Sequence, residues 1–304
     1  MSAPIEARGL VKRYGELTAV DGVELTVEPG DVFGYLGPNG AGKTTSLRMM
    51  LGLIAPTAGE VRLFGRDPHV EGATALDGVA GFVEGPRFYP YLSGRKNLRL
   101  LADLDGGGAS GRIDEVLHLV ELSDRAKDRV GGYSHGMRQR LGIAASLLRD
   151  PKLLLLDEPT TGLDPAGMRD MRELVKRLAA DGITILLSSH ILAEVEELCN
   201  RVAIIRKGRI IYEGRLDDLL QSAGGEYRLT TSDQERARAA LLAHGVGAVE
   251  AVDGELRFRA EASDAEAISI LLGRAGIGIS ALVPHTATLE ELFLGMTEPQ
   301  EAVA

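Results

Sequence analysis

Residues 31–53, "DVFGYLGPNGAGKTTSLRMMLGL", decide the fold of this chain. They begin with a short apolar run typical of a buried strand, continue as a glycine-rich loop, and end in a helical pattern. The loop has the spacing G-x-x-x-x-G-K-[ST] of a P-loop, and it lies between a strand and a helix, which is the context that this pattern requires. A glycine-rich turn that binds nothing is a poor explanation for all three features in this order. The stretch therefore predicts a phosphate-binding loop in an α/β protein.

The chemistry of phosphate binding explains the spacing within the loop. Glycines allow consecutive backbone N–H groups to turn toward phosphate oxygens, and the start of the following helix adds a partial positive charge. Lys43 is placed to reach the β and γ phosphates of a nucleotide, and Thr44 offers a hydroxyl group to Mg²⁺. The residues predicted to hold the phosphates are Gly37, Pro38, Asn39, Gly40, Ala41, Gly42, Lys43, Thr44 and Thr45.

Two adjacent acidic residues end another apolar strand, in "KLLLLDEP" (152–159). Neighbouring strand residues point to opposite sides, so two carboxylates at a strand end can serve different tasks. We expect Asp157 to bind the hydrated Mg²⁺ and Glu158 to act on the water that attacks the γ-phosphate. A solvated pair at a strand end is the alternative, and the presence of a P-loop in the same chain argues against it.

Strands alternate with helical patterns across most of the first 220 residues. Near-continuous apolar runs such as "ITILLSS" (183–189) are typical of a mostly parallel sheet covered by helices on both faces. The opening segment 5–31 has short alternating stretches and turn residues instead, which predict an antiparallel sheet beside that core. Between Gly94 and Val130 the pattern predicts helices, interrupted by the flexible loop "DGGGASG".

A helical run ends in glycines at "LLQSAGGEY" (219–227), and we place a domain boundary there, between a first domain at 1–221 and a second at 226–304. The pattern beyond the boundary is βαββαβ, the ferredoxin-like order of an α+β domain. The second domain has thirteen Asp and Glu residues against six Arg and no Lys, which disfavours a role in gripping phosphate backbones.

The composition of the whole chain excludes several classes of function. At 304 residues with 44% hydrophobic residues the chain can bury a full core, and its net charge of −10 argues against a general nucleic-acid surface. No apolar run approaches the roughly 20 residues that cross a bilayer. We therefore expect a cytosolic chain whose role at a membrane needs a partner.

Three further stretches identify a family. Together with the P-loop, the signature "YSHGMRQRLGIAASLLRDP" (133–151), "DEPTTGLDP" (157–165) and "LLSSHILAEVEELCNRVAII" (186–205) resemble the ATP-binding cassette (ABC) ATPases across residues 5 to 220. The resemblance implies a P-loop NTPase cassette with a RecA-like parallel core, an antiparallel β subdomain and a helical subdomain at about 94–150. It also implies ATP and Mg²⁺ as ligands, and a homodimer in which each ATP lies between the P-loop of one cassette and the signature of the other.

The resemblance assigns roles to residues outside the P-loop. Ser134, which begins a helix, and Gly136 would contact the γ-phosphate across the dimer interface, and Tyr14 would stack on adenine. Asp164 would cross the same interface. His190 would sense the γ-phosphate and hold the water on which Glu158, the implied general base, acts.

The chain departs from the family pattern at two places. The signature has His135 and Met137 where most members have glycine and glutamine. In "GFVEGPRFYPYL" (81–92), Glu84 occupies the place of a glutamine that, in the family, binds Mg²⁺ and the attacking water and links the ATP site to the membrane partner. A carboxylate can also ligate Mg²⁺ through oxygen, although it adds negative charge beside the triphosphate.

The same loop predicts where a permease would dock. Phe88, Tyr89 and Tyr91 follow Glu84 and are candidates for that contact. The glutamate, the stretch 88–98 and the signature resemble the exporter ATPases related to bacitracin and lantibiotic self-protection, and "TLEELFLGMT" (288–297) resembles the ending of drug-exporter ATPases whose permeases are separate chains. The transported substrate cannot be read from such a subunit, because the permease forms the path.

Two alternatives to a transporter ATPase remain. The first is a soluble cassette protein that acts on ribosomes or DNA, but such proteins usually carry two cassettes, a coiled-coil insert or basic extensions, and this chain has one cassette and an acidic tail. The second is a nucleotide sensor without turnover, which the intact Lys43, Asp157, Glu158 and His190 disfavour. We expect the chain to lie at the inner face of the membrane through its permease, and we expect no nucleic acid as a partner.

Overall fold

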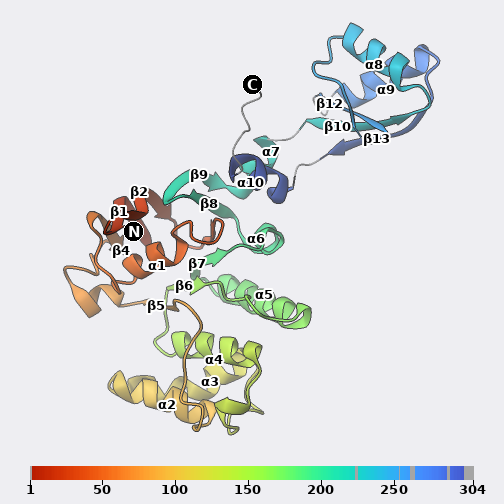
Figure 1. Cartoon of the computed structure of the whole chain (residues 1–304). Helices are drawn as coiled ribbons and strands as arrows, with labels where there is room; N and C mark the ends of the chain where they lie inside the picture. The colour runs from red at the N-terminus through yellow and green to blue at the C-terminus, as the bar shows by residue number, and fades with distance from the viewer. Residues whose placement is uncertain (1, 223–224, 253, 261–263, 286–287, 298–304) are drawn as a thin grey trace. The chain divides into compact units, whose positions relative to one another are not determined.

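The computed structural model describes residues 2–222, 225–252, 254–260, 264–285 and 288–297 (Figure 1). Contacts divide the chain into two compact units, Met1–Leu216 and Asp217–Ala304. This division lies a few residues before the predicted end of the first domain at 221, because the helix that precedes the glycines, α7 (Leu216–Ser222), begins at the division. The predicted second domain reaches residues 298–304, which lie outside the described residues.

The first unit is built on a six-stranded sheet in the order β5-β6-β7-β3-β8-β9. All neighbouring strands are parallel except the last pair, β8 and β9, which is antiparallel. The strands are β3 (Val32–Leu36), β5 (Val79–Phe82), β6 (Leu153–Asp157), β7 (Thr184–Ser189), β8 (Arg201–Arg206) and β9 (Arg209–Arg215). The near-continuous apolar runs of the sequence are therefore the buried strands of a mostly parallel sheet.

Helices cover both faces of this sheet, as Figure 1 shows. Phe33 and Tyr35 of β3 belong to the same buried cluster as Leu47 of α1 (Lys43–Met50). On the opposite face, a Cβ atom on Gly34 would lie 2.9 Å from Val195, so α6 (Leu192–Leu198) approaches β3 closely there. Helix α5 (Pro165–Ala180) packs on the same side as α6.

A three-stranded antiparallel sheet lies beside the parallel core, in the order β2-β1-β4. Its strands are β1 (Ile5–Tyr14), β2 (Leu17–Val27) and β4 (Ala58–Leu63). Buried residues of this sheet join the cluster of α1, so the helix after the P-loop packs between two sheets. Tyr14 ends β1 and faces Leu17 at the turn into β2.

The segment between β5 and β6 is mainly helical. It contains α2 (Gly94–Leu104), η2 (Gly108–Arg112), α3 (Ile113–Leu119), η3 (Val130–Gly132) and α4 (His135–Leu147), and a further short turn, η1 (Gly72–Leu76), precedes β5. Two serines begin the longer helices: the Ser93 hydroxyl accepts a hydrogen bond from the Lys96 N–H, and the Ser134 hydroxyl accepts one from the Met137 N–H.

The second unit has its own sheet and core. Its elements are β10 (Glu226–Thr231), α8 (Gln234–Ala243), β11 (Glu250–Val252), β12 (Glu255–Arg259), α9 (Asp264–Arg274), β13 (Ile279–His285) and α10 (Leu289–Thr297). The strands are antiparallel in the order β11-β12-β10-β13, and Leu229, Phe258, Leu241 and Leu272 are buried between the sheet and helices α8 and α9. Within the described part of the chain, no helix combines the length and the apolarity needed to span a membrane.

Candidate nucleotide-binding site

The P-loop connects β3 to α1, and two of its glycines leave no room for a side chain. A Cβ atom on Gly37 would lie 2.5 Å from the Ile205 carbonyl oxygen, and one on Gly42 would lie 2.5 Å from the Ala19 carbonyl oxygen. Gly42 also has a φ angle of 110°, in the left-handed region, where it begins α1. No described side chain caps this helix, so its first N–H groups keep the capacity to bind an anion.

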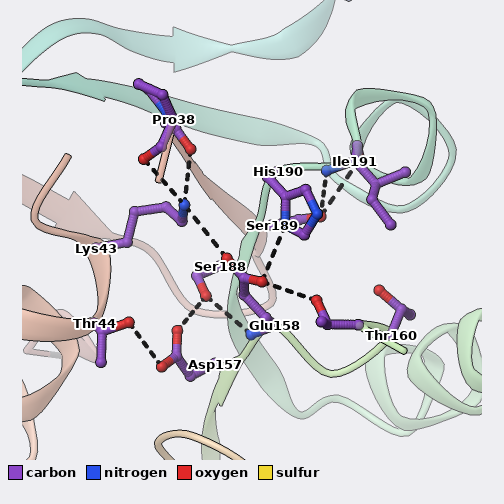
Figure 2. Close-up of polar contacts among 12 residues, drawn as sticks. Pro38, Lys43, Thr44, Asp157, Glu158, Thr160, Ser188, Ser189, His190 and Ile191 are labelled. Carbon is purple, nitrogen blue, oxygen red and sulfur yellow. Dashed lines mark hydrogen bonds and ion pairs between the residues drawn. The ribbon is translucent and has the colours of Figure 1, made fainter. Parts of the chain in front are cut away.

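Lys43 is the first residue of α1, and its side chain is only 5% exposed. The ammonium group donates to the Gly37 carbonyl oxygen at 2.7 Å and lies 3.4 Å from Oε1 of Glu158 (Figure 2). The loop itself therefore holds the cation at its centre, where it can meet phosphate oxygens.

Asp157 ends β6 and faces Thr44. The Thr44 hydroxyl donates to Oδ2 of Asp157 at 3.0 Å, and the Ser188 hydroxyl, from the end of β7, donates to Oδ1 at 2.6 Å (Figure 2). A hydroxyl and one carboxylate beside a phosphate loop fit the donor set of Mg²⁺, which takes few protein ligands and completes its shell with water and phosphate oxygens.

The Glu158 carboxylate has different partners from the Asp157 carboxylate, although Ser188 contacts both residues. The backbone N–H of Glu158 donates to the Ser188 hydroxyl at 3.0 Å, while its carboxylate lies 3.0 Å from Nδ1 of His190 and accepts a hydrogen bond from the Thr161 hydroxyl at 2.8 Å. Burial raises the pKa of Glu158, but the Thr161 hydrogen bond and the charges of Lys43 and His190 outweigh burial and hold the pKa below its ordinary value. The carboxylate is therefore ionised at neutral pH.

A buried carboxylate that was not predicted from the sequence, Glu194, contacts residues close to Glu158 and His190 in the chain. Glu194 in α6 is 2% exposed and accepts hydrogen bonds from the Thr160 hydroxyl at 2.6 Å and the Ser189 hydroxyl at 3.5 Å. Burial raises the pKa of Glu194. Ser188 was missed as well, although two serines that end an apolar strand beside the strand of Asp157 could have indicated it.

A cavity of about 300 Å³ opens over the P-loop. Tyr14 and Leu17 line it from the antiparallel sheet, and Glu158 lines it from the end of β6. Tyr14 is 48% exposed, and the Lys12 ammonium lies 5.3 Å from the centre of its ring. The ring is therefore available for stacking beside the phosphate loop. The lining includes the P-loop residues Asn39, Gly40, Ala41, Gly42, Lys43, Thr44 and Thr45.

Eight predicted site residues do not line this cavity: Gly37, Pro38, Glu84, Ser134, Gly136, Asp157, Asp164 and His190. Ser134 caps α4, and a Cβ atom on Gly136 would lie 3.5 Å from Leu163. The Asp164 carboxylate caps α5 by accepting a hydrogen bond from the Gly167 N–H at 2.8 Å. Proline after the aspartate is a pattern typical of a helix start, so this cap could have been predicted from "DP".

The structure gives Glu84 two contacts. Its backbone N–H donates to Oδ2 of Asp157 at 3.3 Å, and its carboxylate forms an ion pair with Arg48 of α1. Glu84 thus reaches the Asp157 side of the site through its backbone, while the described contact of its carboxylate is with an arginine that the sequence analysis did not consider.

The aromatic residues after Glu84 lie on a braced turn. Tyr89 is 51% exposed and Tyr91 is 64% exposed, with ring centres 5.7 Å apart, while Phe88 is half-buried. Asn97 is buried and holds the turn, because its Oδ1 accepts from the Tyr89 N–H at 2.9 Å and its Nδ2 donates to the Ser93 carbonyl oxygen at 3.0 Å.

Comparison with known proteins places the chain in a family along nearly its whole length. Residues 20–161 match the profile of the family described as ABC transporter. The chain is 40% identical over 306 residues to the uncharacterized ABC transporter ATP-binding protein YhcH of Bacillus subtilis (strain 168), covering 100% of this chain and 99% of that protein. It is 39% identical to the bacitracin transport ATP-binding protein BcrA of Bacillus licheniformis, covering 97% of each. It is 37% identical to the daunorubicin resistance ATP-binding protein DrrA3 of Streptomyces coeruleorubidus, covering 96% and 95%.

Solved structures agree with these sequence matches. The ATP-binding subunit of an ABC transporter superimposes with a TM-score of 0.64 at 31% identity, covering 72% of this chain and 92% of that one. A dimeric ATP-binding cassette bound to ADP and phosphate superimposes with a TM-score of 0.61 at 25% identity, covering 70% and 98%. The predicted cassette fold and the predicted family are therefore confirmed, and the chain belongs to the ATP-binding proteins of the ABC transporter family.

Proposed function

We propose that this chain hydrolyses ATP as the nucleotide-binding subunit of an exporter and thereby drives a separate membrane permease. The observation that carries the proposal is the meeting of Lys43, the Thr44–Asp157 pair and the Glu158–His190 pair at one phosphate loop. Relatives named for bacitracin transport and daunorubicin resistance support export of a drug, an antimicrobial peptide or another amphipathic compound. The chain would lie at the inner face of the membrane through its permease.

Each residue at the loop has a role in this proposal. The α1 N–H groups and Lys43 bind the β and γ phosphates, and the Thr44 hydroxyl and Asp157 hold Mg²⁺. Mg²⁺, when bound, neutralises charge on the phosphate oxygens. Glu158, ionised because its pKa is lowered, accepts a hydrogen bond from the attacking water, and His190 fixes the direction of that carboxylate.

The active form would be a homodimer. Ser134 and Gly136 do not line the cavity over the P-loop of their own chain, yet the N-terminus of α4 is a site where backbone N–H groups favour an anion. A second copy that presents its α4 would close the cavity over the γ-phosphate. Asp164 would lie near this interface while capping α5.

The loop after β5 would receive the permease. Exposed Tyr89 and Tyr91, with Phe88, give an apolar and aromatic surface, and Asn97 keeps the turn in place. Glu84 connects this loop to Asp157 through its backbone N–H, so a movement of the loop reaches the proposed metal site directly. Glu84 could also ligate Mg²⁺ if its carboxylate left Arg48.

The first experiment measures Mg²⁺-dependent ATP turnover by the purified full chain. Glu158→Gln should bind ATP, lower kcat by about 100-fold and accumulate a dimer in size-exclusion chromatography with ATP, because removal of a general base costs at least that factor. Lys43→Ala should lose ATP binding, because its charge is matched to phosphate oxygens. The exposed Glu173→Gln on α5 is the matched control and should behave as the unaltered chain. Equal turnover in Glu158→Gln and Glu173→Gln would refute the role of Glu158.

The second experiment concerns the permease. Co-purification with a membrane protein of about six spans is expected, and Tyr91→Ala should weaken it while basal ATP turnover is retained. Glu84→Gln keeps the shape of the side chain but removes its charge. We expect this variant to change the stimulation of turnover by the permease, and unchanged basal and stimulated rates would show that the glutamate is incidental. Co-purification with ribosomes instead would favour the soluble alternative.

A further inference from the structure

His135, which stands where most of the family has glycine, makes a directed contact with the segment that follows Glu158. It is the first residue of α4, and its Nε2 atom lies 3.0 Å from the Thr161 carbonyl oxygen. A carbonyl oxygen can only accept, so Nε2 is the donor. The ring also lies against Gly162, where a Cβ atom would be 3.4 Å from Nε2.

Thr161 uses a second group to hold Glu158. Its hydroxyl donates to Oε2 of Glu158 at 2.8 Å, while its carbonyl accepts from His135. Threonine is β-branched and stiff at χ1, so the direction of its hydroxyl follows the position of its backbone. A residue that fixes the Thr161 carbonyl therefore also fixes the hydroxyl that orients the Glu158 carboxylate.

A second contact, which is apolar, joins the start of α4 to the segment 161–163. Gly136, the next residue of α4, packs against Leu163, at 3.5 Å from the place of a Cβ atom. The Thr161 N–H is held locally, because it donates to the Glu158 carbonyl oxygen at 3.2 Å. Of the two contacts from α4 to this segment, the His135 hydrogen bond is the directional one, and it acts on the Thr161 carbonyl.

We propose that His135 is a positioning residue, which ties the start of α4 to Glu158 through Thr161. The inference rests on the proposed function, in which Ser134, beside His135, meets the ATP of a second copy while Glu158 acts on the ATP of its own chain. The route His135–Thr161–Glu158 then connects the two ATP sites of the dimer within one chain. A phosphate at Ser134 stabilises the start of α4. The His135 hydrogen bond to Thr161 then also restricts the position of the Glu158 carboxylate.

The test compares three replacements of His135 in the full chain, with kcat and KM for MgATP and the affinity for ATP measured for each. His135→Gln places an amide N–H at about the reach of Nε2, whereas His135→Asn is too short and His135→Leu has no donor. We expect His135→Leu and His135→Asn to lower kcat by about three- to tenfold, the value of one hydrogen bond. KM and ATP affinity should stay within about twofold, and His135→Gln should retain the kcat of the unaltered chain.

A double-mutant cycle with Thr161→Val separates positioning from simple stabilisation, because valine keeps the branched shape but loses the hydroxyl. The double variant His135→Leu/Thr161→Val should be no slower than the slower single variant, since both act through one path. Multiplied losses, equal kcat in His135→Gln and His135→Leu, or no loss in His135→Leu would each overturn the inference. If the unaltered chain turns over ATP, such a result leaves the proposed function intact; absence of turnover in the unaltered chain would refute both.

Discussion

Ser188→Ala tests the connection between the end of β7 and the acidic residues Asp157 and Glu158 at the end of β6. Ser188 is fully buried at the end of β7; its hydroxyl donates to Oδ1 of Asp157 at 2.6 Å and accepts from the Glu158 N–H at 3.0 Å. A hydrogen bond to a charged group contributes about 1.5–3 kcal/mol. The Glu158 N–H keeps the Ser188 backbone carbonyl as an acceptor at 3.2 Å, so the second bond adds little. We therefore expect a loss of about 2–3 kcal/mol in the free energy of unfolding.

The melting temperature of the first unit, Met1–Leu216, converts this loss into a measurable shift. For a unit of this size, 1 kcal/mol corresponds to about 2–4 °C, so Ser188→Ala should lower the Tm by roughly 5–10 °C without nucleotide. The matched control is Ser146→Ala, which removes a buried hydroxyl whose bond is to the Gly142 carbonyl oxygen within α4. Alanine favours a helix by up to about 0.5 kcal/mol, so this variant should shift the Tm by no more than about 2 °C. Equal shifts in the two variants, measured by circular dichroism, would refute the reasoning.

Three further predictions concern other parts of the chain. Gly81→Ala would place a Cβ atom 2.0 Å from the Leu155 carbonyl oxygen and should cost at least about 3 kcal/mol by urea denaturation, whereas Gly85→Ala meets nothing within 4 Å and should cost little. Tyr14→Ala should weaken ATP binding by about 1–3 kcal/mol in titration calorimetry, because it removes the ring that stacks on adenine. Tyr14→Phe should retain the affinity, because phenylalanine keeps an aromatic ring. Equal affinities of the two variants would contradict the stacking role. Burial holds the pKa of Glu194 above its ordinary value of 4.5, so the folded state keeps a proton that the unfolded chain releases as the pH rises above that value. The stability of Glu194→Gln relative to the unaltered chain should therefore increase as the pH rises from 4.5 through the folded-state pKa of Glu194, as measured by urea midpoints, and a decrease over that rise would contradict the sign.

Several parts of the site were predictable because their chemistry depends on local spacing. Gly42, Lys43 and Thr44 are consecutive residues where the loop after β3 enters α1, so their spacing could be recognised from the sequence alone. Asp157 and Glu158 end an apolar strand, and the structure shows them facing different partners. The cassette fold follows from the same order of strands and helices, which explains why the family could be recognised from short stretches.

Other contacts were not predictable, because they join residues that are far apart in the chain. Arg48 pairs with Glu84 across 36 positions. The sequence suggested that Glu84 adds negative charge beside the triphosphate, but this ion pair gives its carboxylate a counter-ion. Ser188 meets Glu158 across 30 positions. Short motifs contain no information on these pairs.

The sequence by itself determined the phosphate loop, the two acidic residues and the alternation of strands and helices, because local spacing and hydrophobic period set them. Only the tertiary structure decided which side chains complete the site. The order of the sheet places β6 beside β7, with Asp157 opposite Ser188, and it directs His135 of α4 onto Thr161. Strand order and helix packing depend on burial summed over the whole core, so no short stretch specifies them.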